Sequence, residues 1–533
     1  MVQNNYYTYM LAIIVSIGGF IFGFDASVIS GVVGFVTAEF SLNAWQQGFV
    51  VSAPTLGAVL ASIGAGPLSD RIGRRKVLII IAALYVVSAI ISAFAPSYAF
   101  LVVARFIGGL AFASLLLAPM YIAEIAPSHL RGRLISINQL NIMIGFSAAY
   151  FSNYLFLQLS QTAGVGWLGF SFNENTWRWM LGIEAIPAIA YFALLFLIPE
   201  SPRWLIINGQ ADKAESIFAR LLNKAQAQVQ INEIKNTLSE KPLSIFQALK
   251  QLFGSKMRLA LLVGLSIAVV QQVTGINAVY FYAPSIFELS GVGKNAAFIQ
   301  AIWIGLINLF FTIFAIFMID KLGRKPLLLI GLFGVVVSMA TIAYGFSQAT
   351  YRIDQQSVHD FSTTIDKQAL TPVLDIEFHS DVEFKQALNS ALGENVVSEH
   401  QGELMKAATT MNSTLILVGL LAFVSSFAIS LGPVMWVLLA EIFPNQVRAV
   451  AISVCGIINS GASFLTQLVF PSELATFGAA WTFSLYGLFA AVGIILMYWL
   501  LPETKGKSLE EMEAVFAKKQ QGNLAPNLDI KSA

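Results

Sequence analysis

Long apolar runs, separated by short polar segments, follow one another along almost the whole chain. A run of about 20 apolar residues forms a helix long enough to cross the roughly 30 Å hydrocarbon core of a bilayer. Twelve such runs predict spanning helices at 9–29, 48–68, 77–96, 100–123, 134–157, 177–198, 259–288, 297–318, 326–346, 411–441, 447–470 and 478–501. The pattern therefore predicts an all-α membrane protein with twelve transmembrane helices.

A short charged motif occurs twice, about half the chain apart. It reads Asp-Arg-Ile-Gly-Arg-Arg at 70–75 and Asp-Lys-Leu-Gly-Arg-Lys at 320–325, and each copy lies between two apolar runs. Internal repeats of this kind are typical of transporters, in which two related halves move about a site near the bilayer midplane. We therefore expect two pseudo-symmetric six-helix bundles. The expected boundaries are 1–200 for the first bundle, 201–258 for a cytoplasmic linker with short helices, 259–503 for the second bundle and 504–533 for a cytoplasmic tail.

Lys and Arg are distributed unevenly among the loops that join the apolar runs. The loops after the second and eighth runs carry four and three basic residues, whereas the loops after the first, third and eleventh runs carry none. Basic loops are retained in the cytoplasm during insertion. We therefore predict a multi-pass protein of the plasma membrane, which is the inner membrane in a bacterium, with both termini cytoplasmic.

One long loop, at about 347–406, falls on the side opposite to the basic loops, and it is acidic. We interpret it as a solvated extracellular or periplasmic insertion with partial helix. The alternative is a cap that binds a cation or a partner, because carboxylate oxygens suit hard cations, although no calcium-loop spacing is present.

Composition narrows the possible partners. Of 533 residues, 56% are hydrophobic and only 11% are charged, against about 25% charged in a soluble domain. The net charge of +1 gives no reason to expect nucleic acid or a strongly anionic ligand. Cys455 is the only cysteine, so an internal disulfide and a cysteine-based metal site are excluded. We expect a lipid bilayer around the protein, and no cofactor or metal.

An acidic and a basic residue inside apolar runs form a candidate pair. Asp25 is in the first run and Arg105 is in the fourth. A charge in the middle of a spanning helix costs about 2.5 to 3.5 kcal/mol on translocon scales, so it usually has a partner and a function. Burial favours the protonated form of Asp25 and a nearby Arg opposes it, so a change in their separation would act as a proton switch. The alternative is a carboxylate near the outer mouth that only caps a helix or is solvated.

Neutral polar side chains form a second set inside the apolar runs. The seventh run contains Gln-Gln-Val-Thr-Gly-Ile-Asn at 271–277, in which Thr and Gly also weaken the helix. Carboxamides donate and accept hydrogen bonds, as an uncharged polyhydroxylated ligand requires. Trp436 in the tenth run could stack on the apolar face of a sugar ring. Further amides of this kind are Gln139, Asn141, Asn308 and Asn459. Each side chain taken alone is equally compatible with a simple interhelical hydrogen bond.

Several motifs together resemble those of the sugar porter family of the major facilitator superfamily. Besides the repeated charged motif, the chain has Pro-Glu-Ser-Pro-Arg at 199–203 and Pro-Glu-Thr-Lys-Gly at 502–506. It also has Pro-Met-Tyr-Ile-Ala-Glu at 119–124, mirrored by Trp-Val-Leu-Leu-Ala-Glu at 436–441. The resemblance covers essentially the whole chain outside the 347–406 insertion, and it implies the major facilitator fold.

The resemblance also implies roles for individual residues. The implied sugar contacts are Gln139, Gln271, Gln272, Asn277, Asn308, Trp436 and Asn459. The aromatics that match pocket or gate positions are Phe22, Phe281 and Tyr282. The residues that match cytoplasmic charge clusters, which lock the outward-facing state, are Asp70, Arg74, Glu124, Arg131, Glu200, Asp320, Arg324, Glu441, Arg448 and Glu503.

Asp25 distinguishes two modes of transport within the family. Proton-coupled members such as the bacterial xylose symporters resemble this chain in carrying Asp in helix 1 and Arg in helix 4, whereas the animal glucose facilitators have Asn at the Asp position. One departure from the family pattern is Ser460, which replaces a frequent Trp. Without the Trp side chain as a wall, the pocket should be larger or more hydrated. The preference of family members for a hexose or a pentose therefore cannot be transferred to this chain.

We therefore predict a monomeric secondary transporter that imports a monosaccharide, whether a hexose, a pentose or a polyol, by proton symport through alternating access. The alternatives are a sugar uniporter, a sodium-coupled symporter and a receptor that binds sugar without transporting it. An enzyme is not expected, because no nucleophile–base pairing or phosphate-binding loop is visible. Three of the four His residues, His359, His379 and His400, lie in the insertion, and the fourth is His129.

Overall fold

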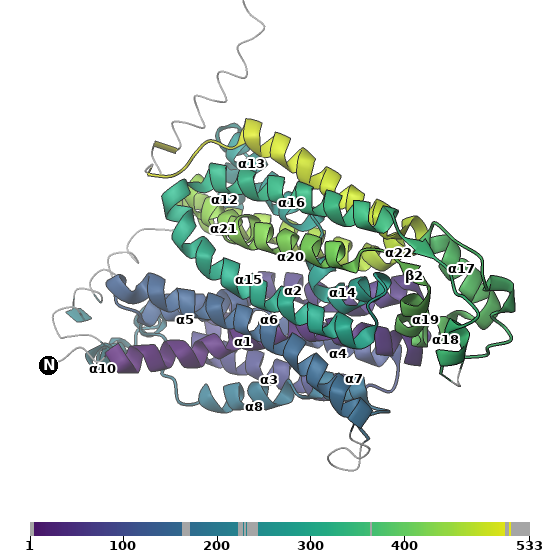
Figure 1. Cartoon of the computed structure of the whole chain (residues 1–533). Coiled ribbons are helices and arrows are strands. Elements are labelled where there is room, and N and C mark those ends of the chain that lie inside the picture. The colour runs from purple at the N-terminus through teal and green to yellow at the C-terminus, as the bar shows by residue number, and fades with distance from the viewer. Residues whose placement is uncertain are drawn as a thin grey trace, which may run out of the picture.

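The computed structural model describes residues 5–162, 171–221, 227–228, 231, 244–362, 365–506 and 511–512. The chain forms two groups of long helices that lie side by side (Figure 1). Most of the expected tail and parts of the expected linker, including residues 232–243, lie outside the described residues.

The first group of helices contains the chain up to Leu194. Its helices are α1 (Asn5–Glu39), α2 (Ala44–Ile72), α3 (Arg74–Ala93), α4 (Tyr98–Ala111), α5 (Ser114–Ile125), α6 (Ser128–Thr162), α7 (Thr176–Gly182) and α8 (Ala185–Leu194). The pairs α4–α5 and α7–α8 each form one interrupted span. The group is therefore six spans, two of them broken, and we refer to it as the N-terminal half.

The second group, the C-terminal half, repeats this arrangement. Its helices are α13 (Arg258–Val273), α14 (Ile276–Leu289), α15 (Lys294–Leu322), α16 (Arg324–Ser347), α20 (Ser413–Ile429), α21 (Leu431–Ile442) and α22 (Asn445–Leu500). The last helix bends at Gly478, whose φ of +77° lies in the region that glycine alone adopts readily, so α22 forms two spans. The pairs α13–α14 and α20–α21 again form interrupted spans.

Ten helical stretches of the described residues are long and apolar enough to cross a membrane. One of these is α22, which the bend divides into two spans, and the short α7 and α8 together supply one more. The prediction of an all-α membrane protein with twelve spanning helices in two pseudo-symmetric bundles is confirmed. Several helices are longer than the apolar runs: α1, expected at 9–29, extends to Glu39.

Short elements connect the two halves and cover one end of them. Between the halves lie α9 (Pro202–Ile207), α10 (Ala211–Leu221), α12 (Ile245–Leu252) and η2 (Ser255–Met257). The insertion contains β1 (Thr350–Tyr351), η3 (Ser357–Asp360), η4 (Thr371–Val373), α17 (Asp381–Leu392), α18 (Glu394–Glu399), α19 (Gln401–Ala408) and β2 (Thr409–Thr410). We call the end of the molecule that carries α17–α19 the insertion end, and the opposite end, where the charged motifs lie, the basic end (Figure 1).

The insertion has a small core of its own and is anchored to the C-terminal half. Its neck is the antiparallel pair β1–β2, and the ring of Tyr351 stacks on that of Phe384 at 5.5 Å between centroids. The backbone N–H of Ala479 donates to Asp381 Oδ2 at 3.2 Å, directly after the bend at Gly478. The insertion therefore caps the turn between the last two spans. Among the described residues, no group of three potential metal ligands is present.

Candidate functional site

A break in the seventh span positions the candidate ligand-binding amides. Helix α13 ends at Val273, and α14 begins after Gly275, whose φ is +86°. The ring of Tyr486 also lies directly against the α-carbon of Gly275, where a side chain would collide with it. Glycine is therefore required here both for the backbone conformation and for the contact. The expected weakening of this helix by Thr and Gly is confirmed.

Four amide side chains of the C-terminal half form one hydrogen-bonded cluster around this break. Asn459 Nδ2 donates to Gln271 Oε1 at 2.7 Å, and Asn277 Nδ2 donates to Gln272 Oε1 at 2.7 Å. Gln272 Nε2 lies 3.2 Å from both Gln271 Oε1 and Asn459 Oδ1, which joins the two pairs. All these atoms are neutral donors and acceptors, and Gln271, Gln272 and Asn459 are each no more than 7% exposed. We refer to these four residues as the amide cluster.

The backbone holds the amide cluster from two sides. Gln271 Nε2 donates to the carbonyl of Leu431 at 2.9 Å, at the break between α20 and α21. Asn459 Nδ2 donates to the carbonyl of Ala268 at 2.8 Å. Three spans that are distant in sequence therefore meet at one polar point, and two of these spans are interrupted nearby.

The other predicted sugar contacts lie apart from the amide cluster. Asn308 is buried, and its Nδ2 donates to Met143 Sδ of the N-terminal half at 3.2 Å. Gln139 and Trp436 are exposed, and neither makes a hydrogen bond with a described residue. Asn141 is half-buried in α6. The structure thus brings together four of the seven predicted sugar contacts.

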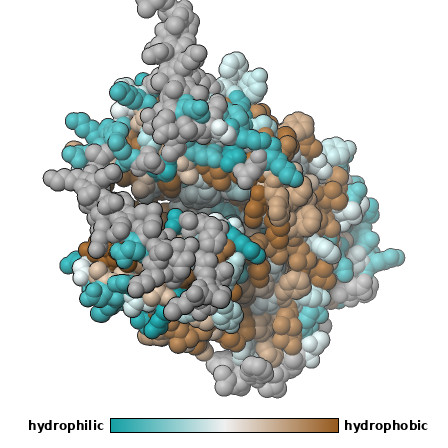
Figure 2. Space-filling view, turned by 90° about the vertical axis from the view of Figure 1, so that its left-hand side faces the viewer, coloured by the Kyte–Doolittle hydropathy of each residue, from teal (hydrophilic) through white to brown (hydrophobic). Residues whose placement is uncertain are grey.

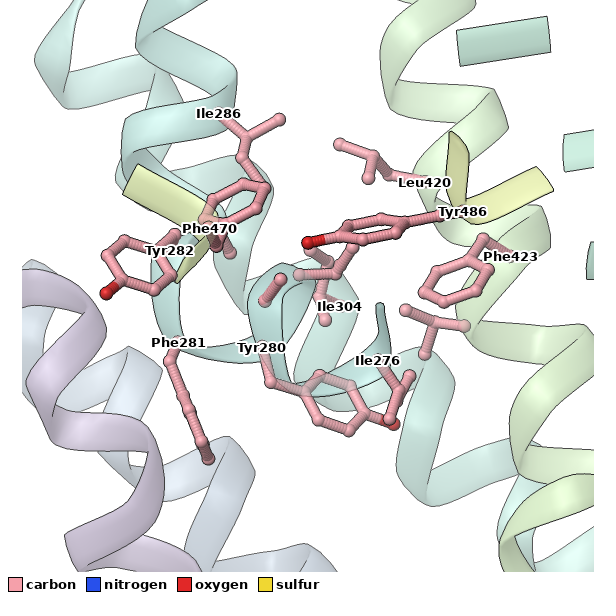
Figure 3. Close-up of a cluster of buried hydrophobic side chains, with 14 of the residues drawn as sticks. Ile276, Tyr280, Phe281, Tyr282, Ile286, Ile304, Leu420, Phe423, Phe470 and Tyr486 are labelled. Carbon is pink, nitrogen blue, oxygen red and sulfur yellow. The ribbon is translucent and has the colours of Figure 1, made fainter. Parts of the chain in front are cut away.

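The three predicted pocket aromatics occupy two different places. Phe22 packs edge-on against Phe112 within the N-terminal half, at 4.6 Å between ring centroids. Phe281 and Tyr282 are buried in α14, where Figure 3 shows Phe281 pointing toward the N-terminal helices and Tyr282 lying beside Phe470. The backbone of Tyr282 departs from helical geometry, with φ −122° and ψ 16°. The seventh span, already interrupted at Gly275, therefore bends again within α14.

The predicted charge pair lies in the N-terminal half and is almost completely buried. Arg105 Nη1 pairs with Asp25 Oδ1, and Arg105 Nη2 donates to the backbone carbonyl of Asp25 at 3.0 Å. The side chains of Asp25 and Arg105 are 1% and 2% exposed. Gly108 of α4 lies beside Asp25 Oδ2, so a larger residue at this position would crowd the carboxylate.

A third charged residue, Glu184, was not predicted from the sequence. It lies at the break between α7 and α8, is 2% exposed, and interacts electrostatically with both Asp25 and Arg105. Asp25 Oδ2, Arg105 Nε and Glu184 Oε1 have no hydrogen-bond partner among the described residues. The sequence did contain a signal, because Glu184 is an acidic residue inside the apolar run at 177–198. We refer to these three residues as the charge cluster.

The predicted cytoplasmic charge residues form two matching groups at the basic end. In the N-terminal half, Arg74 pairs with Asp70 at 2.7 Å and with Glu124 at 3.2 Å. In the C-terminal half, Arg324 pairs with Glu441 at 2.9 Å. Each of these ion pairs therefore stays within one half.

Two further acids of this set cap helices in the same way. Glu200 accepts the backbone N–H of Arg75 at 3.0 Å, and Glu503 accepts those of Arg324 and Lys325, also at 3.0 Å. A carboxylate at a helix N-terminus is favoured by the helix dipole. Burial raises the pKa of the Glu503 carboxyl, but the backbone N–H groups around it outweigh this effect and hold its pKa below the usual value.

The remaining members of the predicted charge set are not in these groups. Arg131 is exposed and forms no ion pair with a described residue. Arg448 donates from Nε to the carbonyl of Phe443 at 3.1 Å, and its Nη2 has no partner among the described residues. The side chain of Asp320 lies outside the described part of the structure.

Contacts between the two halves are found toward the insertion end. Gln158 and Gln161 of α6 donate to Asn295 Oδ1 of α15 at 3.3 and 3.0 Å, and Tyr150 donates to the carbonyl of Tyr280 at 2.7 Å. A cavity of about 630 Å³ lies between the halves and the insertion. Figure 2, which faces the basic end, shows a hollow between the two halves. The molecule is thus closed toward the insertion end and open toward the basic end.

Two bundles of six spans, with buried polar clusters where spans are interrupted, define the class of membrane transporters with the major facilitator fold. The chain belongs to the sugar (and other) transporter family, whose model matches residues 11–360 and 396–516. The internal gap in this match, residues 361–395, falls in the insertion. The chain is therefore a multi-pass membrane transporter and not an enzyme.

Individual relatives and a solved structure resemble the chain over nearly its full length. It is 33% identical to the arabinose-proton symporter of Bacillus subtilis, with 94% of this chain and 93% of the relative covered. It is 34% identical to the D-xylose transporter of Levilactobacillus brevis, with 95% and 94% covered. The inward-open structure of the xylose transporter XylE from Escherichia coli superposes with a TM-score of 0.73 at 29% identity, covering 96% of this chain and all of that one.

Proposed function

We propose that the protein imports a monosaccharide together with a proton by alternating access. The observation that carries the proposal is the presence of two separate buried polar sites, a neutral amide cluster in the C-terminal half and a charge cluster in the N-terminal half. The first suits an uncharged sugar and the second suits a proton. The names of the relatives, a proton-coupled arabinose symporter and a xylose transporter, support the same combination.

Recognition of the sugar uses the amide cluster. Its hydrogen bonds now join Gln271, Gln272, Asn277 and Asn459 to one another. A sugar hydroxyl both donates and accepts, so it can replace an amide–amide hydrogen bond with two bonds to the ligand. A carboxylate or phosphate would find no cation among these four residues. Trp436, exposed at 50%, is available to stack on the ring, and Gln139 and Asn308 complete the proposed set.

Proton binding uses the charge cluster. Asp25, Glu184 and Arg105 buried together carry a net charge of −1 unless one carboxyl holds a proton, and an uncompensated charge in a dry interior is costly. A proton bound here neutralises the cluster, and its release frees a carboxylate to hold Arg105 more firmly. Because the carboxylates lie on α1 and between α7 and α8 while Arg105 lies on α4, movement of these helices changes the affinity for the proton.

The conformation follows from the orientation of the basic end. We assign the basic end to the cytoplasm because its loops are rich in Lys and Arg. The hollow then opens to the cytoplasm, both termini are cytoplasmic, and the structure is inward-facing. In the outward-facing state the two charge groups of the basic end approach each other, and Arg131 and Arg448 are available to form pairs across the halves. We propose that the transporter acts as a monomer, since each polypeptide contains both sites.

The test is uptake of labelled D-xylose, L-arabinose and D-glucose into proteoliposomes under an imposed pH gradient. The wild type should concentrate at least one of these sugars above equilibrium, and Asp25→Asn should abolish concentration while retaining exchange of sugar across the membrane. Sugar exchange is the control, because it shows that the variant is folded and binds its ligand.

The alternatives give different results in this assay. A uniporter equilibrates sugar without concentrating it, and Asp25→Asn then has no effect on the final level. A sodium-coupled symporter requires sodium at constant pH, and a receptor shows binding without uptake. Any of these results would overturn proton symport.

A further inference from the structure

A chain of hydrogen bonds leads out of the amide cluster to the contact between the two halves. Ser463 Oγ of α22 accepts from Asn277 Nδ2 at 2.6 Å and from Gln467 Nε2 at 2.7 Å. Ser463 is 6% exposed and Gln467 is 1% exposed. The hydroxyl oxygen of Ser463 has two acceptor positions, and these two amides occupy both of them.

Gln467 continues this chain into the N-terminal half. Its Oε1 accepts from Thr55 Oγ1 of α2 at 3.0 Å, and its backbone carbonyl accepts from the hydroxyl of Tyr282 at 3.3 Å. The side chain is thus held at both ends, with its NH₂ group toward the amide cluster and its oxygen toward the opposite half. The hydrogen bonds therefore form a continuous path from Asn277 through Ser463 and Gln467 to Thr55. We call this path the relay.

The relay ends where α2 and α22 approach each other closely. Gly48 of α2 lies directly against the backbone carbonyl of Leu468, so any larger residue would collide with α22. Phe49 packs edge-on against Phe464 at 6.3 Å between ring centroids. These contacts and the Thr55–Gln467 hydrogen bond make up one seam, which exists only while the two halves are closed toward the insertion end.

We propose that Thr55, Ser463 and Gln467 are positioning residues that couple occupancy of the amide cluster to closure of this seam. The inference rests on the proposed function, because it assumes that a sugar binds to Asn277. A sugar that fixes Asn277 in its present position keeps Ser463 and Gln467 aligned, and Gln467 Oε1 then faces Thr55. Bound sugar therefore favours the closed seam, and an open seam weakens sugar binding by the same factor.

The relay predicts a specific pattern in two variants. Thr55→Val keeps the shape of the side chain and removes only the hydroxyl, so the closed seam loses one hydrogen bond. We expect the ratio of open to closed molecules to rise about three- to tenfold, as for the loss of one typical hydrogen bond. The dissociation constant of the sugar should rise about two- to fivefold. In a Ser463→Ala background, Thr55→Val should still open the seam but should no longer change sugar affinity.

The experiment uses full-length protein in lipid nanodiscs. Spin labels are attached at Phe94→Cys and Phe477→Cys, two positions that are exposed at the insertion end of opposite halves. The distance between the labels, measured by pulsed electron paramagnetic resonance, reports the separation of the halves. Cys455 is fully buried and is replaced by Ala in all samples. Binding of D-xylose, L-arabinose and D-glucose is measured by calorimetry, and the sugar that binds most tightly is used throughout.

The matched control is Thr466→Val, which likewise removes a threonine hydroxyl, but this hydroxyl lies on α22 and donates to the carbonyl of Ala462 in the same helix. It should change neither the separation of the labels nor sugar affinity. An equal effect of Thr466→Val, an unchanged separation in Thr55→Val, or the same loss of affinity with and without Ser463 would each refute the relay. If the wild type binds none of the three sugars, the proposed function fails instead, while the label separation still tests the seam.

Discussion

The polar clusters proposed as sites in the two halves differ in kind. The charge cluster of the N-terminal half consists of a buried guanidinium and two buried carboxylates, whereas the amide cluster of the C-terminal half consists of four neutral amides, three of them buried and Asn277 half-buried. A buried charge is tolerated only with its partner. The stability of the charge cluster therefore depends strongly on its bound proton and on each of its three residues. A buried amide exchanges one neutral partner for another at small cost. Under the proposed function, this difference lets one fold hold a proton tightly in one half and release a sugar readily from the other.

The halves also differ in how far their polar sites extend. The hydrogen bonds between Arg105 and Asp25 join α4 to α1 and stay within the N-terminal half. The amide cluster is connected through Ser463 and Gln467 to Thr55 in the opposite half. Of the two sites, the neutral one is therefore joined directly to the contact that must open and close. The following changes test this contrast, in order of decreasing effect.

The largest effect is expected when the charge cluster loses its cation. Arg105→Met preserves most of the side-chain volume but leaves two carboxylates buried without a positive partner. The free energy of unfolding should fall by about 3 to 5 kcal/mol, the range for breaking a buried ion pair. The measurement is thermal unfolding of the purified protein in detergent.

A matched control is available at the surface of the insertion. Arg352 pairs with Asp375 at 2.9 Å, but both side chains are largely exposed. Arg352→Met should therefore lower the free energy of unfolding far less than Arg105→Met does. Equal destabilisation by the two Arg→Met changes would show that burial of the charge is not the cause, and the contrast between the halves would fail.

A smaller effect is expected when the amide cluster loses one member. Gln271→Ala removes contacts to Asn459 and to the carbonyl of Leu431, and it leaves both groups without that partner. Sugar affinity should fall about ten- to a hundredfold, which corresponds to about 1 to 3 kcal/mol for hydrogen bonds lost at a buried site. Equilibrium binding of labelled sugar checks this. Gln348→Ala, at an exposed residue after α16, is the control, and undiminished affinity in Gln271→Ala would remove Gln271 from the site.

The smallest effect concerns Glu503, a half-exposed carboxylate at the basic end. Its pKa in the folded protein is lowered, so its ionised form stabilises the fold above the pKa of an unfolded Glu, and this contribution is lost as the pH falls through the lowered pKa. Glu503→Gln should cost about 0.5 kcal/mol at neutral pH, as is usual for exposed charges, and this cost should decrease as the pH falls toward 3. Thermal midpoints measured from pH 3 to 7 check the prediction, with the exposed Glu215→Gln as control. A constant difference across this range would contradict it.

The sequence predicted the fold and the C-terminal amides well because both depend on local information. An apolar run of 20 residues has few alternatives to a spanning helix. Gly275 and its neighbouring amides occur within seven residues, so the break and the polar groups it exposes could be recognised together. The pairing of Asp25 with Arg105 was also predictable, because two opposite charges inside apolar runs lower each other's cost of burial.

Other parts of the site depended on packing between distant segments. Glu184 was visible as a charge in an apolar run, but only the fold shows that it lies beside Asp25 and Arg105. Ser463 and Thr55 are small polar residues of a kind common in membrane helices. Their position in a hydrogen-bonded relay depends on the angle at which α2 meets α22, which the local sequence does not specify.

The sequence alone determined the number of spans, the break in the seventh span and the main kinds of polar group in each half, because these follow from the hydrophobic effect and from backbone chemistry. Only the tertiary structure decided which polar groups touch and which end of the molecule is closed. Exposed Gln139, Trp436 and Arg131 illustrate the reason. The same residues can be buried or exposed as the halves rock, so their contacts belong to one conformation of the chain and not to the sequence itself.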